Sequence, residues 1–283
     1  MTRCADLSPE PKGGRHASSR RVLCRLAVSL LAASILPTGA ADGAHWKSPD
    51  YLVDAFVEIA LGSEHDVRRR QVRKWTTPIH YALIHQTGDA ELHERLIRTH
   101  FEHLAELTGV SIRPAASIEA ANYVVVLTSE SRLKDDLQRH LGGYTAAQRD
   151  KFFRETVCLG TFNSSRRSGR ITRAVAIIPV DRARARGKLP ACIVEELTQV
   201  LGLPNDSDKV YPSIFNDHST DIFLTGLDVL LLRMLYDPRI AHGMEEAELR
   251  PLLRTIAVEI TRDGGFEQAE RAAAAGGLSG LIP

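Results

Sequence analysis

The stretch A-C-I-V-E-E-L-T-Q-V-L-G-L-P-N-D, residues 191–206, decides the fold because it joins an amphipathic helix to a glycine turn and an acidic end. Each residue of an α-helix advances about 100°, so Glu195, Gln199 and Gly202 fall in one stripe and Glu196 lies beside them. The opposite side of the helix is apolar. One interpretation is an ordinary amphipathic helix whose polar face meets solvent and which Gly202 ends.

The same spacing resembles the H-E-x-x-H-x-x-G-x-x-H helix of zincin metallopeptidases, and of the metzincins among them. In that pattern two ligands one turn apart face zinc, a glutamate acts as base, a glycine turns the chain and a third ligand follows. The resemblance puts Glu195 and Gln199 at the first two ligand positions, Glu196 at the base position, Gly202 at the turn and Asn205 at the third ligand position. No ligand position holds a histidine, so the motif is degenerate.

Two further resemblances extend this frame. The segment Y-P-S-I-F-N-D, residues 211–217, resembles the methionine turn of metzincins, with Phe215 at the methionine position and Ser213 in the same turn. The run C-I-x-E-E-x-x-Q-x-L-G-L-x-N-D, from Cys192 to Asp206, resembles the bacterial family called domain of unknown function 2927 (DUF2927). That resemblance covers most of the mature chain and implies an exported protein. It implies no assigned activity.

Working outward from this helix, hydrophobic periodicity predicts an α+β fold. We expect a zincin-like, metallopeptidase-like domain with a small mixed sheet, a long backing helix and the active-site-like helix. The predicted strands are residues 74–84, 121–129 and 173–181, and the predicted helices are 48–62, 91–107, 131–141, 145–155, 221–236 and 245–260, the last as one helix or two halves around Pro251. The expected domains are an N-terminal helical segment over 46–72, the zincin-like DUF2927 domain over 73–262 and a flexible tail over 263–283.

The first 41 residues have the layout of an export signal. Arginines precede the apolar run L-A-V-S-L-L-A-A-S-I-L-P, and small residues follow it. That run is too short for a permanent membrane span, so we expect cleavage and a periplasmic or secreted protein without a stable span. Arg20 and Arg21 partly resemble the twin-arginine motif, but ordinary secretion is the expected route.

Charge argues against a nucleic-acid partner. The whole chain carries 36 basic and 35 acidic residues, and removal of residues 1–41 leaves 30 and 33, so the mature net charge is near −3. Arginine clusters remain at 68–74, 164–173 and 181–188, where an anionic surface could bind. No aromatic residues interleave with them for base stacking, so solvated loop and strand-edge charge is the expected role.

Two cysteines remain in the mature chain, Cys158 and Cys192. In an oxidising compartment such a pair is expected to form a disulfide, which would tie the start of the 191–206 helix to the segment T-V-C-L-G-T-F. A metal-bound or nucleophilic cysteine is the alternative.

Zinc in a peptidase site needs imidazole or thiolate ligands, which this helix lacks. We therefore expect no cofactor and no zinc, with an oxygen-ligated divalent cation as the alternative, since Glu195 and Gln199 offer oxygens. The following loop adds oxygens from Asn205, Asp206, Ser207, Asp208, Asn216, Asp217 and Asp221, although such residues also make turns and cap helices. His218 is either a displaced ligand or base, or a surface histidine.

Three functions follow from these residues. The leading hypothesis is an exported protein that binds a polypeptide or another cell-envelope component in the former substrate cleft, lined by Glu195, Gln199, Asn205 and Asp206. The second is a hydrolase that uses Glu196 as general base with an oxygen-ligated metal or none. The third is a structural envelope module in which the polar residues are only a helix face.

Overall fold

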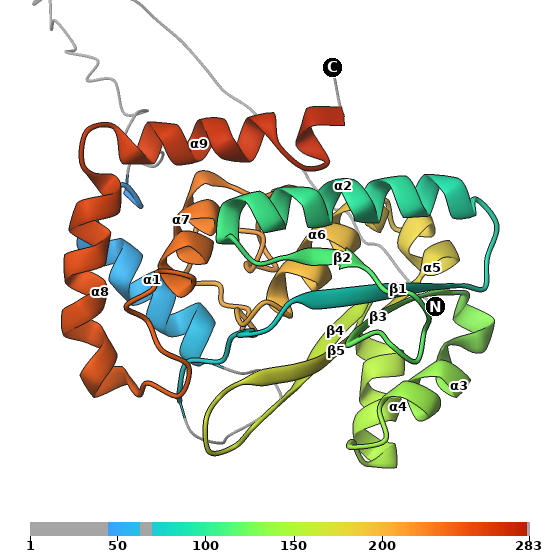
Figure 1. The fold of residues 1–283 in the computed structure, drawn as a ribbon. Coiled ribbons are helices and arrows are strands. Elements are labelled where there is room, and N and C mark those ends of the chain that lie inside the picture. Colours follow the sequence, from blue (N-terminus) through green and yellow to red (C-terminus); the bar gives the residue numbers. More distant parts are fainter. Residues whose placement is uncertain (1–44, 63–69, 282–283) are drawn as a thin grey trace, which may run out of the picture. The chain divides into compact units, whose positions relative to one another are not determined.

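The computed structural model describes residues 45–62 and 70–281 (Figure 1). The predicted export signal over 1–41 lies outside these residues. The elements, in chain order, are α1 (Pro49–Leu61), β1 (Ile79–His85), α2 (Ala90–Thr108), β2 (Ile112–Pro114), β3 (Tyr123–Thr128), α3 (Glu130–His140), α4 (Ala146–Glu155), β4 (Leu159–Ser164), β5 (Ile171–Pro179), α5 (Val180–Ala185), α6 (Leu189–Gln199), α7 (Gly226–Leu235), α8 (Glu246–Thr261), α9 (Gly265–Ala275) and a short 3-10 turn (Ser279–Leu281).

The strands form one mixed sheet of five, in the order β2-β1-β3-β5-β4. The first four are parallel to their neighbours, and β4 pairs antiparallel with β5 as an edge strand. The predicted strands correspond to β1, β3 and β5, although β1 starts at Ile79 rather than at residue 74. The fold is therefore α+β with a small mixed sheet, as the sequence predicts.

The sheet is covered on both faces (Figure 1). Successive side chains of a strand point to opposite faces. On β3, Tyr123 and Val125 belong to the main core with α2 and α6, whereas Val126 belongs to a smaller core under α3 and α4. The long helix α2 and the 191–206 helix, now α6, therefore lie on one face of the sheet, and the two short helices lie on the other.

The N-terminal helix is not a separate segment. Phe56 and Ile59 of α1 are fully buried, and they belong to the same core as β3, α6 and α7. Ser48 caps α1 by accepting a hydrogen bond from the Tyr51 amide, and Pro49 opens the helix. The boundary expected between residues 72 and 73 thus divides one continuous core.

The C-terminal segment also differs from the expected flexible tail. Residues 265–275 form α9, which packs along α7, and Ala269 and Ala273 are buried there. These alanines are one helical turn apart, so small side chains on one face allow a close approach. The preceding segment is a single helix, α8, that continues through Pro251.

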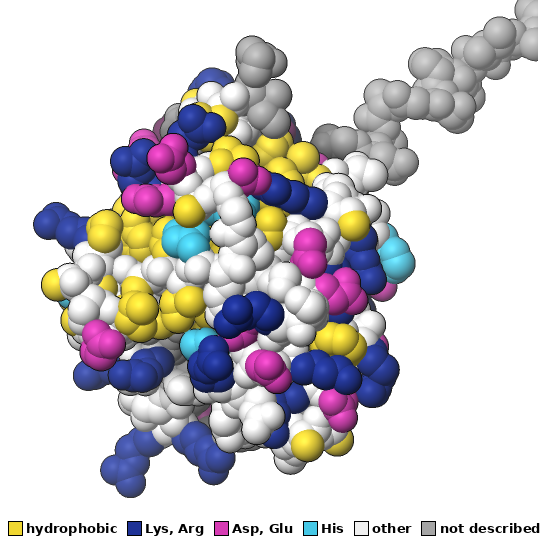
Figure 2. Space-filling model, turned by 90° about the vertical axis from the view of Figure 1, so that its right-hand side faces the viewer, with side chains coloured by type: hydrophobic (Ala, Val, Ile, Leu, Met, Phe, Trp, Pro, Cys, Tyr) yellow, Lys and Arg dark blue, Asp and Glu magenta, His cyan; other side chains and the backbone are white. Residues whose placement is uncertain are grey.

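Charges are mixed on the surface drawn in Figure 2, where basic and acidic side chains alternate without a patch of one sign. Some arginines of the predicted clusters are structural rather than solvated: Arg182 is buried, donates hydrogen bonds to the Phe153 and Thr156 carbonyls and pairs with Glu130.

In the part of the chain that the structure describes, no helix combines the length and apolar character needed to cross a membrane.

Candidate functional site

The site is built on α6, which packs against α2, β4 and β5. Near the first turn of α6, Cys192 forms a disulfide with Cys158, the residue just before β4. The predicted pairing is therefore confirmed. The bridge fixes α6 beside the antiparallel edge strand, so the polar stripe of the helix is held near one edge of the sheet.

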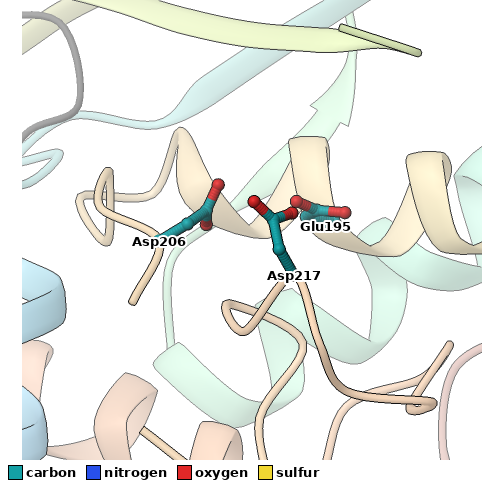
Figure 3. Close-up of side chains that lie close together, drawn as sticks. All are labelled: Glu195, Asp206 and Asp217. Atoms are coloured by element: carbon teal, nitrogen blue, oxygen red, sulfur yellow. The ribbon is translucent and has the colours of Figure 1, made fainter. Parts of the chain in front are cut away.

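Three carboxylates converge beside this helix (Figure 3). Glu195 comes from α6, Asp206 from the segment after it and Asp217 from the following loop, and each offers an oxygen within 4.8 Å of the other two. Among the residues that the structure describes, this is the one such group of three potential ligands, and it contains no histidine. Glu195 and Asp206 were both predicted for the cleft, whereas Asp217 was only one of many nearby oxygens.

Gln199 supports the cluster from one helical turn below Glu195. Its side chain is buried, and its Nε2 donates a 2.7 Å hydrogen bond to Asp206 Oδ1. An amide can donate where a histidine ligand would present a lone pair to a metal. In this chain Gln199 therefore orients a neighbouring carboxylate.

Asn205, at the third-ligand position, turns away to α1. Its Nδ2 donates to the Glu58 carbonyl at 3.1 Å, and its backbone amide donates to the Ile59 carbonyl at 3.3 Å. Asp206, one residue later, belongs to the carboxylate cluster. Asn205 thus binds α1, and its place in a binding cleft stays a prediction.

The turn between α6 and Asp206 depends on Gly202. Its φ is 118°, and a Cβ at this position would overlap the Arg73 carbonyl oxygen. Only glycine adopts this conformation readily and permits this close approach. The glycine at the motif's turn position therefore fixes the direction in which the chain leaves α6.

Glu196, the predicted base, is not a member of the three-carboxylate group. It is only 5% exposed, and a Cβ on Gly160 of β4 would come within 2.9 Å of its Oε2. Burial, and secondarily the charge of Glu196, raise the pKa of the Tyr123 phenol well above its usual value. Glu196 therefore faces the sheet and its edge strand.

The segment that resembles a methionine turn is anchored by a residue that sequence reasoning missed, Asp228 of α7. This fully buried carboxylate accepts hydrogen bonds from Ser213 Oγ at 2.6 Å, from the Ile214 amide at 3.2 Å, and from the amide and hydroxyl of Thr225 at 2.8 and 2.9 Å. Burial raises the pKa of Asp228 to about 6, against the lowering effect of these hydrogen bonds. Phe215 is fully buried in the main core.

A signal for Asp228 was present in the sequence. Thr225 followed three residues later by Asp228 is a capping-box pattern, and the structure contains the reciprocal bonds of that motif. An acidic residue inside the apolar run 221–236 was a second sign. The helix consequently starts at Gly226, five residues later than the apolar pattern alone predicted.

His218 takes a surface position and His100 a structural one. His218 is exposed, with Nε2 3.4 Å from Asp208 Oδ2, and it is not a member of the carboxylate group. His100 is buried between α2 and α6, with Nε2 3.0 Å from Thr198 Oγ1 and 3.2 Å from the Val194 carbonyl. Burial lowers the pKa of His100 to about 3, so its ring is neutral near pH 7.

These features define an α+β domain with a carboxylate cluster beside a disulfide-linked helix. The chain belongs to the family described as protein of unknown function (DUF2927), whose model matches residues 49–255. This span includes α1, which agrees with the continuous core. No curated protein and no solved structure matched the chain.

Proposed function

We propose that this protein is an exported binding module on a zincin-like scaffold, and that its carboxylate cluster recognises a basic segment of a polypeptide in the cell envelope. The observation that carries the proposal is the convergence of Glu195, Asp206 and Asp217 within 4.8 Å. A positive group placed among them would interact with three carboxylates at once. The negative potential of such a cluster also raises the rate at which a positively charged ligand associates.

The edge strand supports a polypeptide as the ligand. In the described sheet β4 pairs only with β5, so an extended chain could add along its other edge. Gly160 of β4 lies against Glu196, the neighbour of Glu195 on α6. A peptide on this edge would therefore run past the helix that carries the cluster, and a lysine or arginine side chain could reach it.

The zincin-like scaffold in this proposal rests on the order of elements and on the turn after α6. Strand, long helix, two strands and the site helix follow in the predicted order, and Gly202 turns the chain as the motif requires. The positions where zinc ligands would be expected are used differently, because Gln199 holds Asp206 and Asn205 binds α1. Binding without zinc chemistry is the function that fits these contacts.

A second candidate is a hydrolase with an oxygen-ligated divalent cation, which the spacing of the cluster favours. Calcium binds oxygens at about 2.3–2.6 Å, so oxygens within 4.8 Å of one another can share one ion. The position of Glu196 weakens this candidate. A general base must reach the attacking water, directly or through one other water, and Glu196 lies against β4 instead.

The test compares peptide binding with metal content in the mature chain, residues 42–283, purified without chelator. The probes are a fluorescent peptide of alternating lysine and threonine and its glutamate counterpart, measured by fluorescence anisotropy. The site variant is Glu195→Gln with Asp217→Asn, and the matched control is Glu94→Gln with Glu102→Gln, two exposed positions on α2.

We expect the lysine peptide to bind with a strong salt dependence, the site variant to bind it at least tenfold more weakly, and the control to bind it normally. Equal binding of the two peptides, or equal weakening by both variants, would overturn the proposal. Near-stoichiometric metal that disappears in the site variant, together with no peptide binding, would overturn the proposal and establish the metal site that the second candidate requires.

A further inference from the structure

A cavity of about 230 Å³ lies on the other face of the sheet, between the strands and the loop that joins α3 to α4. Its floor is a row of three side chains in register across the sheet: Val124 on β3 pairs with Val175 on β5, and Val175 pairs with Thr161 on β4. These strand positions are on the face of the smaller core. The cavity is therefore separated by the sheet from α6.

The loop that forms the other wall is held in place. The Arg149 guanidinium donates to the Leu141 and Tyr144 carbonyls, and the Tyr144 hydroxyl lies 2.7 Å from Thr161 Oγ1. Between them, Gly142 and Gly143 face open space, since a Cβ at either would meet nothing within 4 Å. The space under the loop is thus framed by side chains that are already fixed by hydrogen bonds.

The cavity lining includes polar residues, of which Arg173 and Asn163 are exposed. Arg173 on β5 pairs in register with Asn163 on β4, and both line the cavity. His140 also lines it, and His140 Nε2 is buried without a hydrogen-bond partner. Among the described lining residues there is no aspartate, glutamate or lysine, so the net charge of the lining comes from the Arg173 guanidinium.

We propose that this cavity binds a small organic carboxylate whose apolar part, the body of the ligand, is about the size of one six-membered ring. The carboxylate would pair with the Arg173 guanidinium and the Asn163 amide, while the body would lie on Val124 and Val175. Arginine suits this task because its planar fork matches a carboxylate with two hydrogen bonds.

The volume sets the size of the ligand. A protein cavity of about 150 Å³ can hold benzene, so one ring with a carboxylate fits a cavity of 230 Å³. Ligand sites for larger molecules begin at roughly 300 Å³.

The experiment is a titration of the mature protein with benzoate, cyclohexanecarboxylate and the neutral isostere benzamide, followed by chemical shifts in two-dimensional NMR. The variants are Arg173→Gln, which removes the charge, and Val175→Phe, which fills the floor. The matched control is Arg113→Gln, an exposed arginine on β2 that is outside the lining.

We expect both carboxylates to bind in the millimolar range or more tightly, and benzamide to bind at least tenfold more weakly. Arg173→Gln should weaken carboxylate binding at least tenfold, whereas Arg113→Gln should bind the carboxylates as the parent protein does. Equal affinity for benzoate and benzamide, equal effects of the two arginine variants, or no binding to the parent protein at 10 mM would overturn the proposal. If Val175→Phe does not fold, the exposed Arg173 variant still decides the result. Glu195→Gln with Asp217→Asn should leave benzoate binding intact, so this site is tested separately from the peptide site.

Discussion

Breaking the Cys158–Cys192 bridge should destabilise the fold mainly through the unfolded state. The cysteines are 34 positions apart, so the bridge closes a loop of 35 residues that contains β4, β5 and α5. For a loop of this length the chain-entropy model gives about 3.8 kcal/mol at 25 °C. We therefore expect reduction of the parent protein to lower the free energy of unfolding by about that amount.

Replacing both cysteines adds a second effect. Cys192 is only 1% exposed, so Cys158→Ala with Cys192→Ala removes buried sulfur and leaves a void that costs on the order of 1 kcal/mol more. The double variant should consequently be less stable than the reduced parent protein. The difference between these two samples separates packing from chain entropy.

The measurement is urea unfolding of the oxidised, reduced and double-variant proteins, followed by the fluorescence of the buried Trp46 and Trp75. The m-value should rise when the bridge is absent, because the uncrosslinked unfolded chain exposes more surface. The double variant serves as the control for the reductant, to which it should not respond. A loss below about 1 kcal/mol on reduction, with an unchanged m-value, would refute the reasoning from loop entropy.

Two further predictions concern buried ionisable groups. Asp228→Ala leaves three hydrogen-bond donors without their acceptor, since the Thr225 hydroxyl can still donate to the Pro212 carbonyl, and it should cost about 3 kcal/mol or more, against about 1 kcal/mol for Thr225→Ala, as measured by urea unfolding. Equal losses would mean that Asp228 acts only as a helix cap. His100 has a folded pKa of about 3 against a usual 6.5, so the unfolded chain takes up a proton in this range that the folded chain excludes. The stability that His100 contributes is complete above pH 6.5 and is lost as the pH falls towards 3, by up to roughly 5 kcal/mol. His100→Gln should therefore lose less stability than the parent protein between pH 7.5 and 4.5, and parallel losses would contradict the assignment.

The buried strands could be predicted because their signal is local. Most residues of β3 and β5 are β-branched or small, and most are buried or half-buried, so each strand contains a continuous apolar run. The edge strand β4, L-G-T-F-N-S, has no such run, since its residues are mostly half-exposed. Its strand conformation depends on antiparallel pairing with β5 and on the bridge at Cys158, which are both non-local.

The C-terminal helix was missed for a different reason. The segment around Ala269 and Ala273 has small side chains, and it ends in glycines, which is typical of frayed ends. These small side chains are instead what allows α9 to approach α7. Whether this segment is a frayed end or a packed helix depends on the position of α7, which the sequence of the segment does not specify.

The candidate site was predictable as far as the helix extends. Helical periodicity correctly brings Glu195 and Gln199 to one stripe, because their spacing of four residues is one turn. Asp217 could not be placed in this way. Its loop is anchored by Ser213 and Ile214 on Asp228, a carboxylate that follows Asp217 in the sequence and belongs to another helix.

The choice between Asn205 and Asp206 shows where motif spacing stops being informative. Beyond Gly202 the chain leaves the helix, so counting residues no longer fixes which side chain faces back towards Glu195. That choice is made by the contact between Asn205 and Glu58, two residues 147 positions apart, which rotates Asn205 towards α1 and leaves Asp206 to accept from Gln199. Residue spacing therefore places Glu195 and Gln199 on one side of α6, whereas the side chain that faces them after the turn depends on the element that packs against the turn.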